Sequence, residues 1–148
     1  MKKLFLYYSY SGNGDFVAEA MKEKGYDIRK VETVKGLPKV SFFAMLAGGF
    51  QASAKKKAEL KEYNQDVSKY DEIVIGSPIW NGRISPAINT VLANLKLNEN
   101  QKLAFVFYAG GGTGPSAEKR IKKEYPNARY VFLKAPKQNE EELEKLKF

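Results

Sequence analysis

The sequence predicts an α/β fold, a three-layer sandwich in which helices cover both faces of a five-stranded parallel sheet. Two observations support this prediction. Short apolar runs alternate along the chain with stretches of helical spacing. Four of these runs are continuously apolar, which is typical of strands that are covered on both faces. The chain is expected to form one domain over residues 1–148.

The expected strands follow one another with helices between most of them. The first is LFLYY (residues 4–8), and YDIRKVE (26–32) mixes polar and apolar residues, which suits an edge strand. The remaining three are EIVIG (72–76), LAFVFY (103–108) and YVFLK (130–134). The chain between the second and third expected strands shows no regular pattern.

Helices are expected after the first, third, fourth and fifth strands. After the third strand, apolar residues recur at helical spacing at Ile84, Ile88, Val91, Leu92 and Leu95. After the fourth, Pro115 behind Gly114 suits the first position of a helix. The tail QNEEELEKLKF (138–148) begins with acids and ends with lysines, an order that the helix dipole favours.

Composition narrows the classes of function. The chain contains no cysteine and no histidine, which excludes thiolate nucleophiles, disulfides, iron–sulfur ligation and nearly all zinc chemistry. No metal site is expected. Because histidine is the side chain best suited to proton transfer near neutral pH, demanding catalysis would depend on a bound cofactor.

Charge and hydropathy bear on partners and location. The net charge is +8, but the lysines are scattered, and the triple at residues 55–57 is followed closely by Glu59 and Glu62. A nucleic-acid partner is therefore not expected, since it would require basic and aromatic residues concentrated on one element. No apolar run approaches the roughly 20 residues that cross a bilayer. A cytoplasmic protein with no membrane partner is expected.

The first of three unusual loops, SYSGNG (9–14), joins the first expected strand to a helix. Ser9 and Ser11 offer hydroxyls, and the glycines let backbone N–H groups surround an anion at the positive end of the helix. An ordinary capped turn uses the same residue types. A phosphate site is the favoured interpretation.

Two other phosphate motifs are weaker. The pattern Gly12-x-Gly14-x-x-Val17 imitates the dinucleotide fingerprint, and Glu32 lies about twenty residues onward. However, Val17 stands where the third glycine belongs, and the two serines favour a terminal phosphate over a bridging pyrophosphate. The mononucleotide motif Gly-Lys-Ser/Thr occurs in none of the loops.

The other two loops follow the third and fourth expected strands. GSPIWNGRISP (76–86) places the single tryptophan, Trp80, beside a turn-forming Asn-Gly pair, where it can stack on a flat ligand or belong to the core. YAGGGTGP (108–115) offers bare backbone to a planar group, or serves as a flexible connector. Because the carboxyl ends of parallel strands share one edge, the three loops are expected to converge on a mononucleotide with a tricyclic base.

These motifs resemble those of the flavodoxin family. Residues 9–14 resemble the flavodoxin phosphate loop, residues 76–82 the segment that wraps the isoalloxazine ring in short-chain flavodoxins, and residues 108–112 the third flavin loop. Val17-Ala18 and GGF (48–50) also fit a branch of flavodoxin-like proteins. The resemblance covers essentially the whole chain. It implies the strand order 2-1-3-4-5 and noncovalent binding of FMN.

The resemblance also implies roles for the loop residues. The first loop would hold the phosphate, Trp80 would stack on the ring beside an apolar wall of Pro78 and Ile79, and the third loop would line the pyrimidine side or the other face. No catalytic residue is assigned. The expected FMN-binding set is Ser9, Tyr10, Ser11, Gly12, Asn13, Gly14, Ser77, Pro78, Ile79, Trp80, Asn81, Gly82, Tyr108, Gly110, Gly111 and Gly112.

Two features depart from the flavodoxin pattern. Gly14 replaces a hydroxyl residue that is common in the family's phosphate loop. The charge of +8 is opposite to that of typical flavodoxins, whose acidic surfaces dock basic partners.

The resemblance favours a low-potential electron carrier that exchanges electrons with redox partner proteins, a reductase and an acceptor. The alternative is an FMN-dependent NAD(P)H reductase of quinones or similar small acceptors on the same fold. The short chain without an obvious second nucleotide loop favours the carrier over a stand-alone enzyme. A non-redox nucleotide-binding module built on Gly12-x-Gly14 is a more distant possibility.

Overall fold

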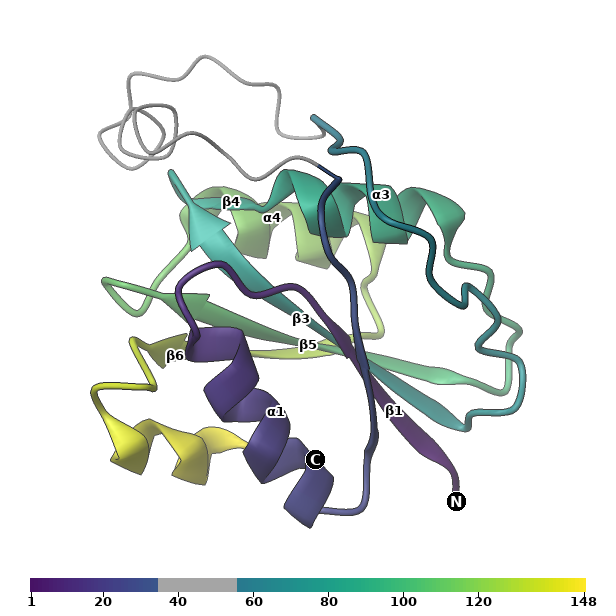
Figure 1. Cartoon of the computed structure of the whole chain (residues 1–148), viewed down its shortest axis with the longest axis horizontal. Coiled ribbons are helices and arrows are strands. Elements are labelled where there is room, and N and C mark those ends of the chain that lie inside the picture. The colour runs from purple at the N-terminus through teal and green to yellow at the C-terminus, as the bar shows by residue number, and fades with distance from the viewer. Residues whose placement is uncertain (35–55) are drawn as a thin grey trace.

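Five parallel strands form the centre of the protein. The structure, a computed structural model, describes residues 1–34 and 56–148. In these residues the sheet order is β2-β1-β3-β5-β6, which confirms the predicted order of the parallel strands (Figure 1). The strands are β1 (Lys3–Tyr7), β2 (Asp27–Lys30), β3 (Glu72–Trp80), β5 (Lys102–Ala109) and β6 (Arg129–Lys134).

The third strand is longer than the sequence predicts. It continues through residues 77–80, which pair with β5 at Ser77 and Pro78, and then turns back into the short antiparallel strand β4 (Arg83–Ile84). The turn residues Asn81 and Gly82 have φ values of 52° and 75°. Positive φ at both central positions is the requirement of the tight turn that Asn-Gly favours. The predicted loop is thus largely a hairpin.

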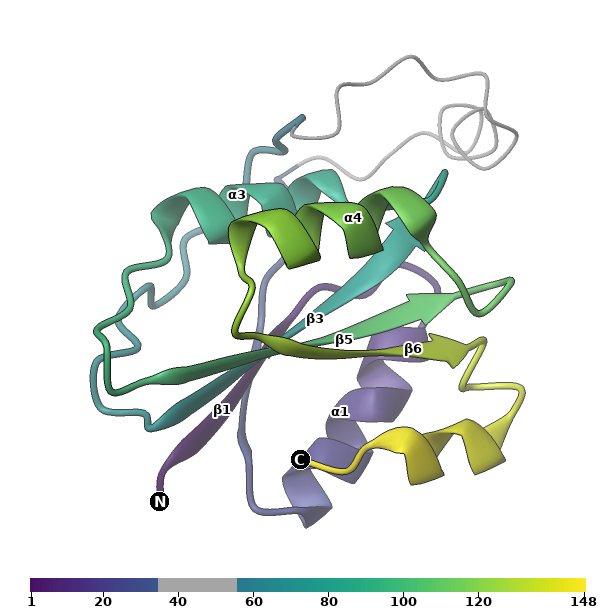
Figure 2. The same ribbon diagram turned by 180° about the vertical axis from the view of Figure 1, so that it is seen from behind.

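Helices cover both faces of the sheet, as predicted (Figures 1 and 2). One face carries α1 (Asn13–Glu23) and the C-terminal segment, and the other carries α3 (Pro86–Asn94) and α4 (Pro115–Glu124). The helix expected in the C-terminal tail is present, and residues Glu140–Lys145 form it as the 3-10 helix η1. The inward-facing apolar side chains there, Leu143 and Leu146, are three residues apart, and a helix of three residues per turn points both at the sheet.

Each helical layer encloses its own apolar core. The sheet separates the two cores, and alternate residues of β5 belong to different ones. Phe105 and Phe107 pack toward α3 and α4, while Val106 and Tyr108 pack toward α1. Leu133 and Leu146 complete the second core. No helix in the described ranges is long and apolar enough to cross a membrane. The GGF motif at residues 48–50 lies outside the described residues.

Candidate functional site

The loops after β1, β3 and β5 meet at the carboxyl edge of the sheet, as the strand order requires. Tyr108, on β5, donates a hydrogen bond from its hydroxyl to the backbone oxygen of Tyr8, the residue between β1 and the first loop. The backbone N–H of Ala117, in α4, donates to the oxygen of Gly82 at 2.9 Å. Direct contacts therefore join β5 to the end of β1, and the helix that follows the third loop to the second loop.

The first loop has the features of an anion site. Gly12 is the N-cap residue of α1 with φ 93°, a conformation that favours glycine. The Ser9 hydroxyl accepts a hydrogen bond from the backbone N–H of Gly14 at 3.0 Å, and the Ser11 side chain is exposed. The loop thus presents a hydroxyl and a helix N-terminus at the same place.

Position 14 requires a glycine because a side chain there would clash with its neighbours, not because of its backbone conformation. Gly14 is not among the described glycines with positive φ. A Cβ placed on it would lie 2.6 Å from the Tyr108 hydroxyl oxygen and 2.7 Å from Cβ of Ser9. The buried side chain of Tyr108 therefore packs directly against Gly14. Burial raises the pKa of this tyrosine well above its ordinary value. The hydroxyl remains a donor to Tyr8 at physiological pH.

An aromatic cluster links the first and second loops. Trp80 is 7% exposed, and its ring meets the rings of Tyr8 and Tyr10 edge-on, each at a centroid distance of 6.0 Å. Tyr10 is the more open of the three at 37% exposure. Trp80 thus lies beside Tyr10 of the first loop, and a flat ligand there would meet the exposed Tyr10 ring.

Ser77 has an internal role in the described structure. Its side chain is fully buried, and its hydroxyl donates to the oxygen of Pro78 at 2.8 Å and lies 3.0 Å from the Ser85 hydroxyl. Ser85 caps the N-terminus of α3. The hydroxyl of Ser77 therefore ties the hairpin to α3, and the prediction that Ser77 contacts FMN stays a prediction.

The third loop combines an open and a packed part. A Cβ on Gly110 or Gly111 would meet nothing within 4 Å, so the backbone there is accessible. By contrast, a Cβ on Gly114 would lie 2.9 Å from the Phe132 ring and 3.1 Å from Ile79. The packed end fixes the loop against the second loop, and the open end leaves room for a ligand.

Sequence reasoning missed a fourth loop at the same edge, after β6. Its Lys137 donates its backbone N–H to the side-chain oxygen of Asn13 at 3.0 Å. Since every parallel strand ends at this edge, the position of β6 alone could have drawn attention to residues 135–139. These residues carry no glycine-rich or serine-rich pattern, which is why they were not selected.

The acidic side chain that directly follows the first loop has two partners in the described structure. Asp15, in the first turn of α1, accepts a hydrogen bond from the Tyr7 hydroxyl at 2.7 Å and forms an ion pair with Lys30 at 3.0 Å. Burial and the bond to Asp15 raise the pKa of Tyr7. The repulsion of an anion by this carboxylate is therefore reduced.

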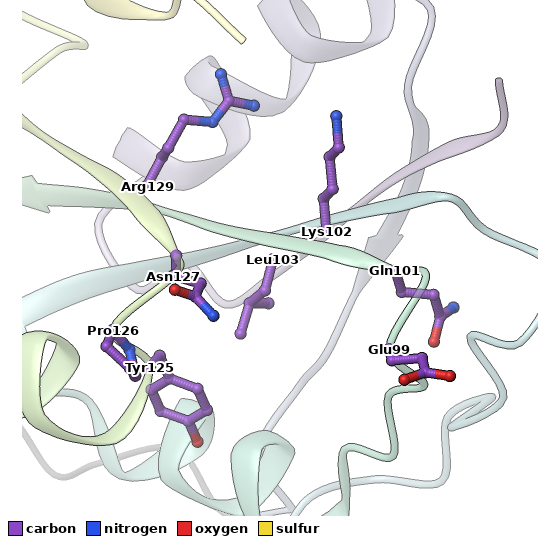
Figure 3. A pocket seen from close by; sticks show the side chains of 9 residues that line it. Glu99, Gln101, Lys102, Leu103, Tyr125, Pro126, Asn127 and Arg129 are labelled. Atoms are coloured by element: carbon purple, nitrogen blue, oxygen red, sulfur yellow. The ribbon is translucent and has the colours of Figure 1, made fainter.

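A hollow of about 220 Å³ adjoins the first loop, lined at one side by Tyr8, Ser9 and Tyr10 and at the other by residues at the end of β2. A larger hollow of about 620 Å³ lies at the starts of β5 and β6, with Lys102 and Arg129 on its wall (Figure 3). The larger one is at the amino edge of the sheet. The loops that carry the candidate site are at the opposite edge, where ligands of open α/β sheets bind.

Residues 11–132 match the family model described as NADPH-dependent FMN reductase. The chain belongs to this family. The match includes residues 11–14 of the first loop, without Ser9 and Tyr10, and the whole of the second and third loops. Curated proteins include no match to the chain.

Several solved structures share the fold. A protein described as a flavoprotein from Bacteroides eggerthii is 19% identical, with 94% of each chain covered and a TM-score of 0.72. A flavoprotein from Lactobacillus acidophilus in complex with FMN is 22% identical, with 95% of this chain and 97% of that chain covered and a TM-score of 0.66. An azoreductase from Bacillus anthracis is 16% identical, with 98% of this chain and 92% of that chain covered and a TM-score of 0.52.

These comparisons confirm the predicted fold class and FMN as the cofactor. They confirm the flavodoxin resemblance only in its coarser form, that of a flavodoxin-like FMN-binding protein. The family that matches is that of the FMN reductases rather than the flavodoxins themselves.

Proposed function

We propose that this protein is an NADPH-dependent oxidoreductase that works through bound FMN and reduces quinones or similar small acceptors. The observation that carries the proposal is the match of residues 11–132 to the NADPH-dependent FMN reductases. The similar azoreductase fold adds azo compounds as acceptors to be tried. This proposal replaces the electron carrier as the favoured function.

The residues at the carboxyl edge fit FMN in three respects. The first loop offers the Ser11 hydroxyl and the N-terminus of α1 to a phosphate. The third loop offers open backbone at Gly110 and Gly111, and Tyr10, whose ring meets that of Trp80, offers an exposed aromatic side chain. An FMN molecule with its phosphate at the first loop and its flat ring along the second and third loops would contact all three loops.

Hydride from NADPH brings two electrons, and a quinone that takes them with two protons leaves as a hydroquinone. Bound FMN supplies the ring system that accepts and passes on these electrons. The protein's part is to bind and orient. Its first loop would hold the phosphate, and its second and third loops would border the ring and leave one side open to the two substrates in turn.

The residues around the site offer no side chain that titrates near pH 7, because the chain has no histidine and no cysteine. Burial raises the pKa of Tyr8, so its hydroxyl stays protonated at neutral pH. The one proton that the hydride does not supply would therefore come from water rather than from a side-chain acid.

The experiment is to load the full-length protein with FMN and follow the oxidation of NADPH in the presence of a quinone or an azo dye. Turnover that requires FMN and both substrates supports the proposal. A protein that binds FMN, leaves NADPH unoxidised, and accepts electrons only when a separate reductase is added is an electron carrier instead.

A further inference from the structure

Lys137 lies over the first loop, although 124 residues separate it from Asn13 along the chain. Its backbone N–H donates to the Asn13 side chain at 3.0 Å. A Cβ placed on Gly12 would lie 3.1 Å from the Lys137 ammonium nitrogen. The charged end of this lysine therefore sits against the N-cap residue of α1.

The turn that carries Lys137 is held in place from several sides. The backbone N–H of Ala135 donates to the oxygen of Ala109, at the end of β5, at 3.0 Å. The oxygen of Ala135 accepts from the N–H groups of Gln138 and Asn139. Ala135 has φ 38°, an unfavourable conformation for a residue with a Cβ. The backbone beneath Lys137 is thus fixed independently of its side chain.

The ammonium of Lys137 has no carboxylate within ion-pair distance in residues 1–34 and 56–148. Two other lysines on the same side of the sheet differ, since Lys30 pairs with Asp15 at 3.0 Å and Lys145 with Glu142 at 2.8 Å. Lys137 therefore adds an uncompensated positive charge beside the helix N-terminus, at the loop that carries the serine hydroxyls. A dianionic phosphate is the ligand chemistry that suits this combination.

We propose that Lys137 binds the phosphate of FMN and so selects FMN over riboflavin. This inference rests on the proposed function, in which the phosphate lies at residues 9–14. It also goes beyond the family match, which ends at residue 132. The lysine would act as a point charge that completes the phosphate site from a strand end on the far side of β5.

The test is a titration of the flavin-free full-length protein with FMN and with riboflavin, followed by flavin fluorescence. Lys137→Ala should weaken FMN binding about tenfold, the effect of losing one charge-assisted contact at an exposed site, and leave riboflavin binding unchanged. Lys137→Arg should retain most of the FMN affinity. Lys119→Ala is the matched control, because it removes the same charge from α4 on the opposite face of the sheet.

Salt gives a second readout that does not depend on turnover. Raising the ionic strength should weaken FMN binding more in the wild-type protein than in Lys137→Ala, since the variant lacks the screened charge. The inference is overturned if Lys137→Ala behaves like Lys119→Ala, or lowers FMN and riboflavin affinity equally, while the wild type binds FMN. If the wild type binds neither flavin, the proposed function fails together with the inference.

Discussion

Replacing Gly14 by alanine tests how the first loop is built. In a helix, alanine is favoured over glycine by about 1 kcal/mol, so propensity alone predicts a more stable protein. The added Cβ, however, would lie 2.6 Å from the Tyr108 hydroxyl oxygen, 2.7 Å from Cβ of Ser9 and 2.9 Å from Cζ of Tyr108. Both neighbours are held, Tyr108 by burial and by its bond to Tyr8, and Ser9 by its bond to the Gly14 N–H.

Overpacking costs about 1–3 kcal/mol, and contacts at 2.6, 2.7 and 2.9 Å place Gly14→Ala in the upper part of that range, at about 2–3 kcal/mol. After the propensity gain of about 1 kcal/mol, the variant should lose about 1–2 kcal/mol of unfolding free energy. For a chain of this size that corresponds to a fall in Tm of about 3–6 °C. The measurement is urea and thermal unfolding of the flavin-free protein, followed by circular dichroism. Gly110→Ala is the control, because a Cβ there meets nothing within 4 Å and stability should not change.

A second variant locates the cause. Tyr108→Phe removes the hydroxyl oxygen, the atom nearest to the added Cβ. The double variant Gly14→Ala/Tyr108→Phe should therefore lose less unfolding free energy than the sum of the losses of the two single variants. The rescue should be partial, since Cβ of Ser9 remains 2.7 Å away. If Gly14→Ala is as stable as the wild type or more so, the packing argument is wrong and propensity decides at this position.

Three further results are expected. Ser11→Ala should weaken FMN binding by about one to two orders of magnitude through loss of a charge-assisted hydrogen bond, with riboflavin binding as the unaffected comparison. FMN should strongly quench the fluorescence of Trp80, the single tryptophan; unquenched emission from the FMN-loaded protein would place the ring elsewhere. Stability should fall as pH rises above about 10, because the unfolded chain then ionises a tyrosine whose pKa is raised in the folded state, as that of Tyr7 is by burial and by Asp15. Tyr7→Phe should reduce this alkaline loss of unfolding free energy, and an identical pH dependence in wild type and variant would contradict the assignment.

Sequence reasoning was most effective where the signal is local. Each continuous apolar run became a parallel strand, and the Asn81-Gly82 pair became the tight turn between β3 and β4. The strand ends then placed three loops at one edge, which is the basis of the candidate site. In the tail the sequence predicted a helix but not its type, because the spacing of Leu143 and Leu146 suits a 3-10 helix as well as an α-helix.

The sequence by itself determined the fold class, the flavin-type loops and the absence of thiol and imidazole chemistry, because these depend on residue type and on spacing along the chain. Only the tertiary structure decided why Gly14 is a glycine, why the Ser77 hydroxyl is buried, and which lysine lies over the first loop. Those answers depend on contacts between strand ends that are far apart in sequence. Tyr108 reaches Gly14 and Lys137 reaches Asn13 only after β1, β5 and β6 have taken their places in the sheet.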